Sequence, residues 1–518
     1  MKILEGKSAR CGAAVLIFGG LCVAGLVSCA RTADRAADRA PAAVKIGPSD
    51  TVEGLAAKAA GVVPSARQLA WQALEFQAFF HFGVNTFTDR EWGTGTEDPK
   101  IFNPTDFDAG QWIAAVKAAG IRGVILTAKH HDGFCLWPSR FTEHSVKNSP
   151  WRGGKGDVVR EVADACRRAG LKFGFYLSPW DRHEPSYGDS PRYNEHFKDQ
   201  LRELLTGYGE ISEVWFDGAC GEGPNGRRQV YDWAGYWRLI RELQPGAVIS
   251  IMGPDVRWIG NEAGVTRESE WSVIPVVGFE DGPAEMNPGG IAHLDAQAKD
   301  LGSFGRIAEA ARLGGRLLWY PGQVDVSIRP GWFYHTAEDD KVKPLAQLID
   351  IYYTSVGGNA QLLLNIPPDR RGRLHENDVT RLKELGEALR TTFAVNLAAG
   401  AKVMTSPEVA AGRITEAQGD RLVHGDSAPE FAPEYDLRGE KTFNTALIKE
   451  PIKNGQKIES FALDAWEGGA WREIAKGTTI GWKKLLRFPI VRTAKVRLRI
   501  LKARAEPGLP EFGLFLDR

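Results

Sequence analysis

The sequence predicts an α/β chain that forms a (β/α)8-like (TIM) barrel, followed by a C-terminal antiparallel β-sandwich. Two observations predict the barrel. Helical stretches that end at a glycine alternate with short, continuously apolar strands, as in parallel sheets buried on both faces. Polar and aromatic residues follow nearly every strand, as expected where all strand ends face one cleft. A doubly wound sheet is the alternative. Beyond residue 395, short runs with period-2 alternation, clearest at 496–500, indicate antiparallel strands.

Length and composition are consistent with a large catalytic domain and a smaller second domain in 518 residues. The 65 basic and 65 acidic residues balance, so nothing in the charge suggests a nucleic-acid partner. The 16 tryptophans suit sugar binding, because pyranose faces stack on indole rings, and they equally suit an ordinary large core.

The N-terminal residues 1–28 have the pattern of a bacterial lipoprotein signal. A basic start precedes an apolar run at 13–28, which is shorter than the ~20 residues of a membrane span. Leu26 and Ser28 precede Cys29 as in a lipobox, and this resemblance implies cleavage before Cys29 and lipidation of its thiol. We therefore expect a lipid-anchored protein of the bacterial cell envelope, in the periplasm or outer membrane. A plain signal peptide with an incidental cysteine is the alternative. Residues 29–62 read as a flexible tether.

The barrel is expected over residues 63–395. An aromatic strand at 76–83 comes first. Helix–strand units follow, and a polar helix closes the barrel. The units are 111–119 with 123–128, 157–169 with 173–177, 197–205 with 213–217, and 229–243 with 248–252; further strands are expected at 316–320 and 361–366, with a helix at 344–355 between them, and the closing helix at 374–392.

Residues with catalytic chemistry stand where these strands end. Asp217 comes directly before Gly218, a position that holds a carboxylate rigidly above the sheet, although an acid there can also cap the next segment. The loop after the fifth strand contributes Glu262. Two carboxylates, with histidine and arginine to donate to sugar hydroxyls and aromatic rings to cover apolar faces, match glycoside hydrolysis. The polar and aromatic strand-end residues are His81, His130, His131, Tyr176 and Arg257.

The pair His130-His131 also raises the question of a metal site. Adjacent histidines at the end of a strand point in different directions, and no third ligand is evident in the sequence. We therefore expect neither a metal nor another cofactor.

Eight motifs carry a family resemblance over residues 71–390. In chain order they are FFHFGVNTF, EWGTG, TAKHHDGFCLW, FYLSPWD, EVWFDGA, GNEAG, DVSIRPGWFYH and LLLNIPPDRRG. Together they resemble glycoside hydrolase family 29, the α-L-fucosidases. The GNEAG and SIRPGWFYH segments are similar to the branch that cleaves α-1,3/1,4-linked fucose from branched glycans.

This resemblance implies a retaining mechanism in which Asp217 is the nucleophile and Glu262 the acid/base. The apolar neighbours Ile259 and Ala263 would favour the protonated form that a general acid needs. Glu268 and Glu270 are the competing candidates. The substrate-binding residues that the resemblance implies are His81, Glu91, Trp92, His130, His131, Tyr176, Trp215 and Arg257, with Trp332 as a stacking ring.

Two further expectations follow from the resemblance. Gln323 stands where many relatives carry an acid, which would alter the preference for the sugar beyond the fucose if that acid contacts it. Residues 396–518 resemble the sandwich that follows the barrel in this family, and we interpret this sandwich as a structural support rather than a sugar-binding module.

The expected function is therefore an exo-α-L-fucosidase that acts on terminal α-1,3/1,4-linked fucose of branched oligosaccharides or glycoconjugates. A broad-specificity α-L-fucosidase and a glycosidase for another 6-deoxy or galacto-configured sugar are alternatives of the same class. A lipid-anchored glycan-binding protein with a catalytically dead site is an alternative of a different class. The presence of both carboxylates argues against the dead site.

Overall fold

The fold is described from a computed structural model, which describes residues 43–277, 298–404 and 431–517. The predicted signal sequence, Cys29 and the first part of the tether lie outside the described residues. Within the described part of the chain, no helix is both long enough and apolar enough to span a membrane.

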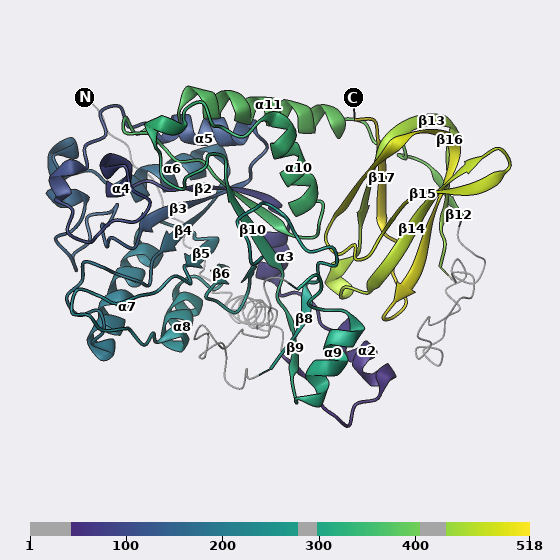
Figure 1. Cartoon of the computed structure of the whole chain (residues 1–518), viewed down its shortest axis with the longest axis horizontal. Helices are drawn as coiled ribbons and strands as arrows, with labels where there is room; N and C mark the ends of the chain where they lie inside the picture. Colours follow the sequence, from purple (N-terminus) through teal and green to yellow (C-terminus); the bar gives the residue numbers. More distant parts are fainter. Residues whose placement is uncertain (1–42, 278–297, 405–430, 518) are drawn as a thin grey trace, which may run out of the picture. The chain divides into compact units, whose positions relative to one another are not determined.

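Eight parallel strands form a nearly closed barrel (Figure 1). Neighbouring strands are paired in the order β6-β5-β4-β3-β2-β11-β10-β7, and a single bridge between Ser250 and Val256 links the two ends. The predicted barrel is thus confirmed. Its strands are β2 (Phe76–Phe80), β3 (Gly123–Lys129), β4 (Lys172–Leu177), β5 (Glu213–Phe216), β6 (Val248–Ile251), β7 (Arg257–Trp258), β10 (Gly322–Ser327) and β11 (Gln361–Asn365).

Helices cover the outside of this sheet (Figure 1). Residues 252–256, which join β6 to β7, contain no helix, so this connection lacks the helix expected between neighbouring barrel strands. The covering helices are α5 (Ala109–Ala118), α6 (Val158–Ala169), α7 (Ser190–Gly207), α8 (Trp233–Leu243), α10 (Leu345–Ser355) and α11 (Glu376–Thr392), whereas α9 (Phe304–Arg312) packs on a separate antiparallel sheet.

The local sequence explains why each unit starts and stops where it does. In α6 the side chain of Asp157 accepts a hydrogen bond from the Arg160 amide at the N-terminus, and Gly170 ends the helix with a φ of 72°. Val158, Val162 and Cys166 are buried on one face. All seven residues of β3 are buried, because helices cover one face of the sheet and the barrel interior lies on the other.

Two sequence-based expectations about the barrel surroundings are wrong. The apolar run expected as a barrel strand at 316–320 forms β9 (Arg316–Trp319) of a separate antiparallel sheet, between β1 (Val44–Lys45) and β8 (Val273–Val276). The tether expected over 29–62 ends earlier, because β1 pairs with β9 and α2 (Val52–Ala60) buries Leu55 and Ala59 beside Ile307 of α9. Alanine-rich helices give a weak hydrophobic pattern, which resembles that of a linker.

The C-terminal antiparallel sheet is confirmed. Its strands are β12 (Lys402–Met404), β13 (Glu434–Lys449), β14 (Ile458–Glu467), β15 (Ala470–Gly477), β16 (Lys484–Ala503) and β17 (Glu511–Phe515). β12 pairs with the first residues of β13 and β17 with its last ones, while β14 pairs with the second half of β16. The two long strands therefore take part in both sets of pairings around a core that includes Phe443, Phe461 and Leu498.

Candidate active site

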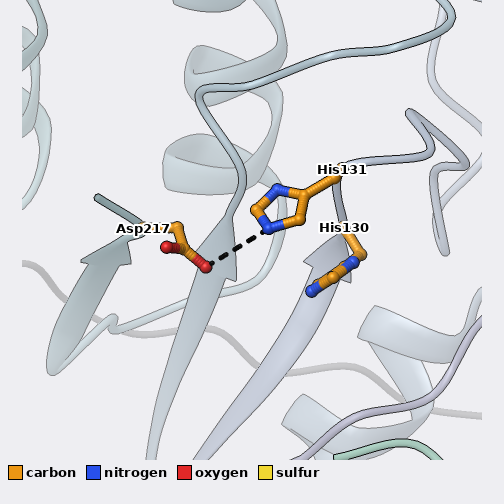
Figure 2. Close-up of side chains that lie close together, drawn as sticks. All are labelled: His130, His131 and Asp217. Atoms are coloured by element: carbon orange, nitrogen blue, oxygen red, sulfur yellow. Dashed lines mark ion pairs between the residues drawn. The ribbon is translucent and has the colours of Figure 1, made fainter. Parts of the chain in front are cut away.

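Asp217 lies directly after β5, at the carboxyl end of the barrel strands. Its Oδ2 accepts a hydrogen bond from the Tyr176 hydroxyl at 2.8 Å, and its Oδ1 accepts one from the Ala219 amide at 2.8 Å. The side chain is 24% exposed, and Nε2 of His131 lies 3.6 Å from Oδ2 (Figure 2). The carboxylate is thus held at both oxygens while it remains open to a ligand.

Tyr176, near the end of β4, is the hydrogen-bond donor that fixes Asp217. Burial, together with the neighbouring Asp217 charge, raises the pKa of this phenol well above its usual value. The hydroxyl group therefore stays protonated and donates a hydrogen bond to the carboxylate. The ring also stacks on Trp215 with centroids 5.3 Å apart, and Trp215 donates from Nε1 to Gln323 at 2.9 Å.

The hydrogen bonds around His131 determine which of its nitrogens carries hydrogen. The Ser178 hydroxyl donates its single proton to the Trp180 carbonyl at 2.7 Å, so at 2.7 Å from His131 Nδ1 it can only accept. Nδ1 is therefore the protonated nitrogen. Burial lowers the pKa of His131, although the Asp217 charge opposes the shift, so the neutral ring presents a lone pair at Nε2 beside Asp217.

His81 follows β2, and, as in His131, its Nδ1 carries the hydrogen while its Nε2 does not. Asn365 uses its amide hydrogens on the Trp332 carbonyl and on Ser327 Oγ, so its Oδ1 accepts from His81 Nδ1 at 2.8 Å. Burial lowers the pKa of His81 to about 3, so this ring is neutral at physiological pH. The structure thus corrects one expectation, because Nε2 of His81 and of His131 carries no hydrogen and is an acceptor, not a donor.

His130 lies between these groups. Its ring stacks on Tyr176 with centroids 5.6 Å apart and planes 14° apart, and it is close to His131, with centroids 4.1 Å apart. Burial and the two neighbouring histidines lower its pKa well below the usual value. The neutral ring leaves Nδ1 without a hydrogen-bond partner within the described part of the chain.

The sequence showed no third metal ligand beside His130 and His131, and this expectation is wrong. Ligand atoms of His130, His131 and Asp217 all lie within 4.8 Å of one another (Figure 2). β3 ends at Lys129, so the alternation of a strand no longer separates the two histidines. These three groups are the ones that could hold a metal ion among the described residues, although the Tyr176 hydroxyl already binds Asp217 Oδ2.

Glu91 and Trp92 come from the loop after β2. Glu91 accepts hydrogen bonds from the backbone amides of Trp332 at 2.9 Å and Phe333 at 3.2 Å, so it positions the loop that carries Trp332. Trp92 is exposed, and its ring meets His131 edge-on with centroids 5.3 Å apart. The Trp332 ring lies 5.2 Å from that of His81. The two tryptophans thus contact different histidines of the cluster.

Glu262 is joined to the cluster through Trp332, whose Nε1 donates to Glu262 Oε2 at 3.3 Å. The apolar environment expected for Glu262 does not form, because Ile259 is buried away from solvent while Glu262 and Ala263 are exposed. Glu262 is thus connected through Trp332 to the ring of His81, without a hydrophobic pocket for its carboxyl group.

Arg257 does not join the cluster. It is buried, and its guanidinium pairs with Glu270 and donates to the carbonyls of Trp271 and Tyr320, each at 3.0 Å. This ion pair also removes Glu270 from the candidates for the acid/base, because a carboxylate that is buried and held by arginine cannot reach a ligand. Glu268 is exposed.

Sequence reasoning missed Trp258 and Asp325. Trp258 is the neighbour of Arg257 in β7, and alternation along the strand places its side chain on the opposite face. Its Nε1 donates to Asp325 Oδ1 at 2.6 Å. Gln323 lies two residues before Asp325 in β10. It is buried, and its side chain is hydrogen-bonded to Trp215 and Glu213. The sequence did contain a signal for Asp325, because an acidic residue stands there between the apolar residues Val324 and Val326.

Comparisons with known proteins show which family the chain resembles. The family model described as Alpha-L-fucosidase matches residues 65–262 and 308–392. Alpha-L-fucosidase 1 of Arabidopsis thaliana is 44% identical over 470 residues, which cover 88% of this chain and 88% of the plant protein.

Two solved structures extend the similarity to three dimensions. A glycoside hydrolase 29 family member from an unknown rumen bacterium is 41% identical, with a TM-score of 0.73 over 88% of this chain and 78% of its own. A Ruminococcus gnavus GH29 fucosidase, solved in complex with fucose, is 30% identical, with a TM-score of 0.72 over 93% of this chain and 98% of its own.

Proposed function

The chain belongs to the α-L-fucosidase family of glycoside hydrolases, and on that premise we propose that it is a retaining exo-enzyme. Its proposed substrate is terminal α-1,3/1,4-linked L-fucose on branched oligosaccharides or glycoconjugates. The observation that carries the proposal is the environment of Asp217, a partly exposed carboxylate held by Tyr176 and Ala219 among three neutral histidines. Fucose bound to the R. gnavus relative supports the choice of sugar.

The proposed reaction has two steps, as in other retaining glycosidases. In the first, a carboxylate oxygen of Asp217 bonds to the anomeric carbon while the bond to the glycosidic oxygen breaks, and Glu262 gives that oxygen a proton. In the second, Glu262 takes a proton from water, whose oxygen attacks the same carbon and releases Asp217. The hydrogen bonds to both oxygens of Asp217 orient it before the reaction begins.

The histidines determine how the sugar is recognised in this proposal. His81 and His131 each offer an unprotonated Nε2, so each accepts a hydrogen bond from a sugar hydroxyl. Trp332 lies beside His81, and Trp92 lies beside His131, so both rings are placed to cover apolar faces of the bound fucose. No metal or other cofactor takes part in this mechanism.

The α-1,3/1,4 preference rests on the GNEAG and SIRPGWFYH motifs and is tested with two substrates. We expect fast release of fucose from a Lewis-type trisaccharide and slow release from an aryl α-L-fucoside, measured as kcat/KM under the same conditions. The reverse order would support the broad-specificity enzyme instead. Release of fucose from neither would leave a dead glycan-binding site or a different sugar, and sugar binding by the wild type would separate these two.

We also propose that Cys29 carries a lipid that anchors the enzyme in the bacterial envelope. The support is the sequence Leu26-Val27-Ser28-Cys29 after the apolar run. Expressed in a Gram-negative host, the wild type should fractionate with membranes, and C29S should be soluble with unchanged activity. Equal membrane fractions for the two proteins would contradict the anchor.

A further inference from the structure

Asp325 is a third carboxyl group at the site, with no role in the two proposed steps. It lies in β10 and is only 5% exposed. Its pKa is raised to about 7, mainly by burial and also by the charges of Glu262 and, less strongly, Asp217, whereas the hydrogen bond from Trp258 opposes the rise. Asp325 is therefore electrostatically coupled to both proposed catalytic carboxyls, and more strongly to Glu262.

One oxygen of Asp325 remains available to a ligand. Trp258 Nε1 binds Oδ1 at 2.6 Å, while Oδ2 has no hydrogen-bond partner among the described residues. A buried carboxyl group with an unused oxygen normally binds water or a ligand hydroxyl. Near pH 7 this carboxyl is present in both protonation states, so it can donate to a sugar hydroxyl or accept from one.

Trp258 supplies an aromatic surface at the same place. It is 39% exposed, although it lies in a barrel strand, and its hydrogen bond to Asp325 fixes the orientation of the indole. Trp332 is fixed in the same way by Glu262. Each of these carboxyl groups thus holds one tryptophan, and an exposed indole face is a surface on which a pyranose ring stacks.

The position of Glu262 indicates which part of the substrate meets this pair. A general acid lies next to the glycosidic oxygen, and the rest of the glycan continues from that oxygen. Trp258 is the last residue of β7, and Glu262 lies four residues further on, in the loop that begins there. Trp258 and its partner Asp325 therefore lie at the base of the loop that carries the proposed acid. We propose that Asp325 and Trp258 bind the sugar to which the fucose is attached, with the indole face against its ring and Asp325 Oδ2 on one of its hydroxyls. This inference rests on the proposed function.

The test compares D325A and W258A with wild type, using the Lewis-type trisaccharide as substrate and free L-fucose as product inhibitor. Each substitution should raise KM for the trisaccharide at least about tenfold and leave the inhibition constant of L-fucose within about twofold. D325N keeps the volume of the side chain and a carbonyl acceptor for Trp258, and we expect a smaller rise in KM. W466A is the matched control, because Trp466 is 38% exposed and lies in β14, away from the barrel strands.

Three outcomes would overturn the inference. Equal weakening of L-fucose and trisaccharide binding would place Asp325 and Trp258 in the fucose pocket. Unchanged kinetics in D325A and W258A would leave them a purely structural role, while the function itself stands. A wild type that releases fucose from the aryl fucoside but not from the trisaccharide would overturn the α-1,3/1,4 proposal and this inference together.

Discussion

The D217A variant is expected to lose at least about 10⁴-fold in kcat on any fucoside while it still binds L-fucose. The substitution removes the proposed nucleophile, whereas His81, His131 and Trp332, which face the sugar in the proposal, come from other strands and loops. Turnover is measured by fucose release, and sugar binding by calorimetry. Retention of more than a tenth of the wild-type kcat would exclude Asp217 as nucleophile.

Azide separates loss of the nucleophile from general damage to the site. In D217A the small anion can enter the space left by the carboxylate and attack the anomeric carbon from that side. The expected product is a fucosyl azide of inverted configuration, identified by proton NMR. A variant that binds L-fucose yet forms no azide adduct from a fucoside with a good leaving group would speak against this geometry.

The E262A variant has the second largest expected effect, and this effect depends on the leaving group. Loss of a general acid costs about 10²- to 10⁴-fold in rate, and the trisaccharide needs that proton because a sugar alkoxide is a poor leaving group. A nitrophenolate leaves without protonation, so the first step with the nitrophenyl fucoside should be nearly unchanged in stopped-flow measurements. The slow second step should then allow the covalent intermediate to accumulate.

E268A is the matched control for E262A. Glu268 is also exposed, lies six positions further along the same segment, and was one of the two competing candidates for the acid. We expect wild-type kinetics from this variant. Loss of trisaccharide cleavage in E268A with normal activity in E262A would reverse the assignment. Glu270 is unsuitable as a control, because its removal would leave the buried Arg257 without its counter-ion.

The strand ends were the most predictable part of this molecule. Helix–glycine–strand units predicted the barrel because they combine helical periodicity with apolar runs buried on both faces. Asp217 could be found because it stands between a buried strand and Gly218. The strand at 316–319 could not be assigned correctly, because an apolar run of four residues looks the same in a barrel and in a separate antiparallel sheet.

The direction of a side chain, and whether a group donates or accepts a hydrogen bond, could not be predicted from the sequence. Arg257 and Trp258 are neighbours, and only the register of β7 against β10 determines which of them faces the barrel interior. The acceptor character of His131 depends on Ser178, which donates to the Trp180 carbonyl. His131 follows β3 whereas Ser178 follows β4, so the sequence does not show that they are in contact. The exposure of Glu262 likewise depends on how the loop after β7 packs, which its apolar neighbours in sequence did not predict.

The most direct test of the account is to trap the intermediate on the wild-type enzyme with 2-deoxy-2-fluoro-L-fucosyl fluoride. The fluorine at C2 destabilises the oxocarbenium-like transition states of both steps, while the fluoride leaving group allows the first step to proceed. After proteolysis, mass spectrometry should find one fluorofucosyl group, on the peptide that contains Asp217. An adduct on another carboxylate, or none in an enzyme that turns over fucosides, would contradict a retaining mechanism through Asp217.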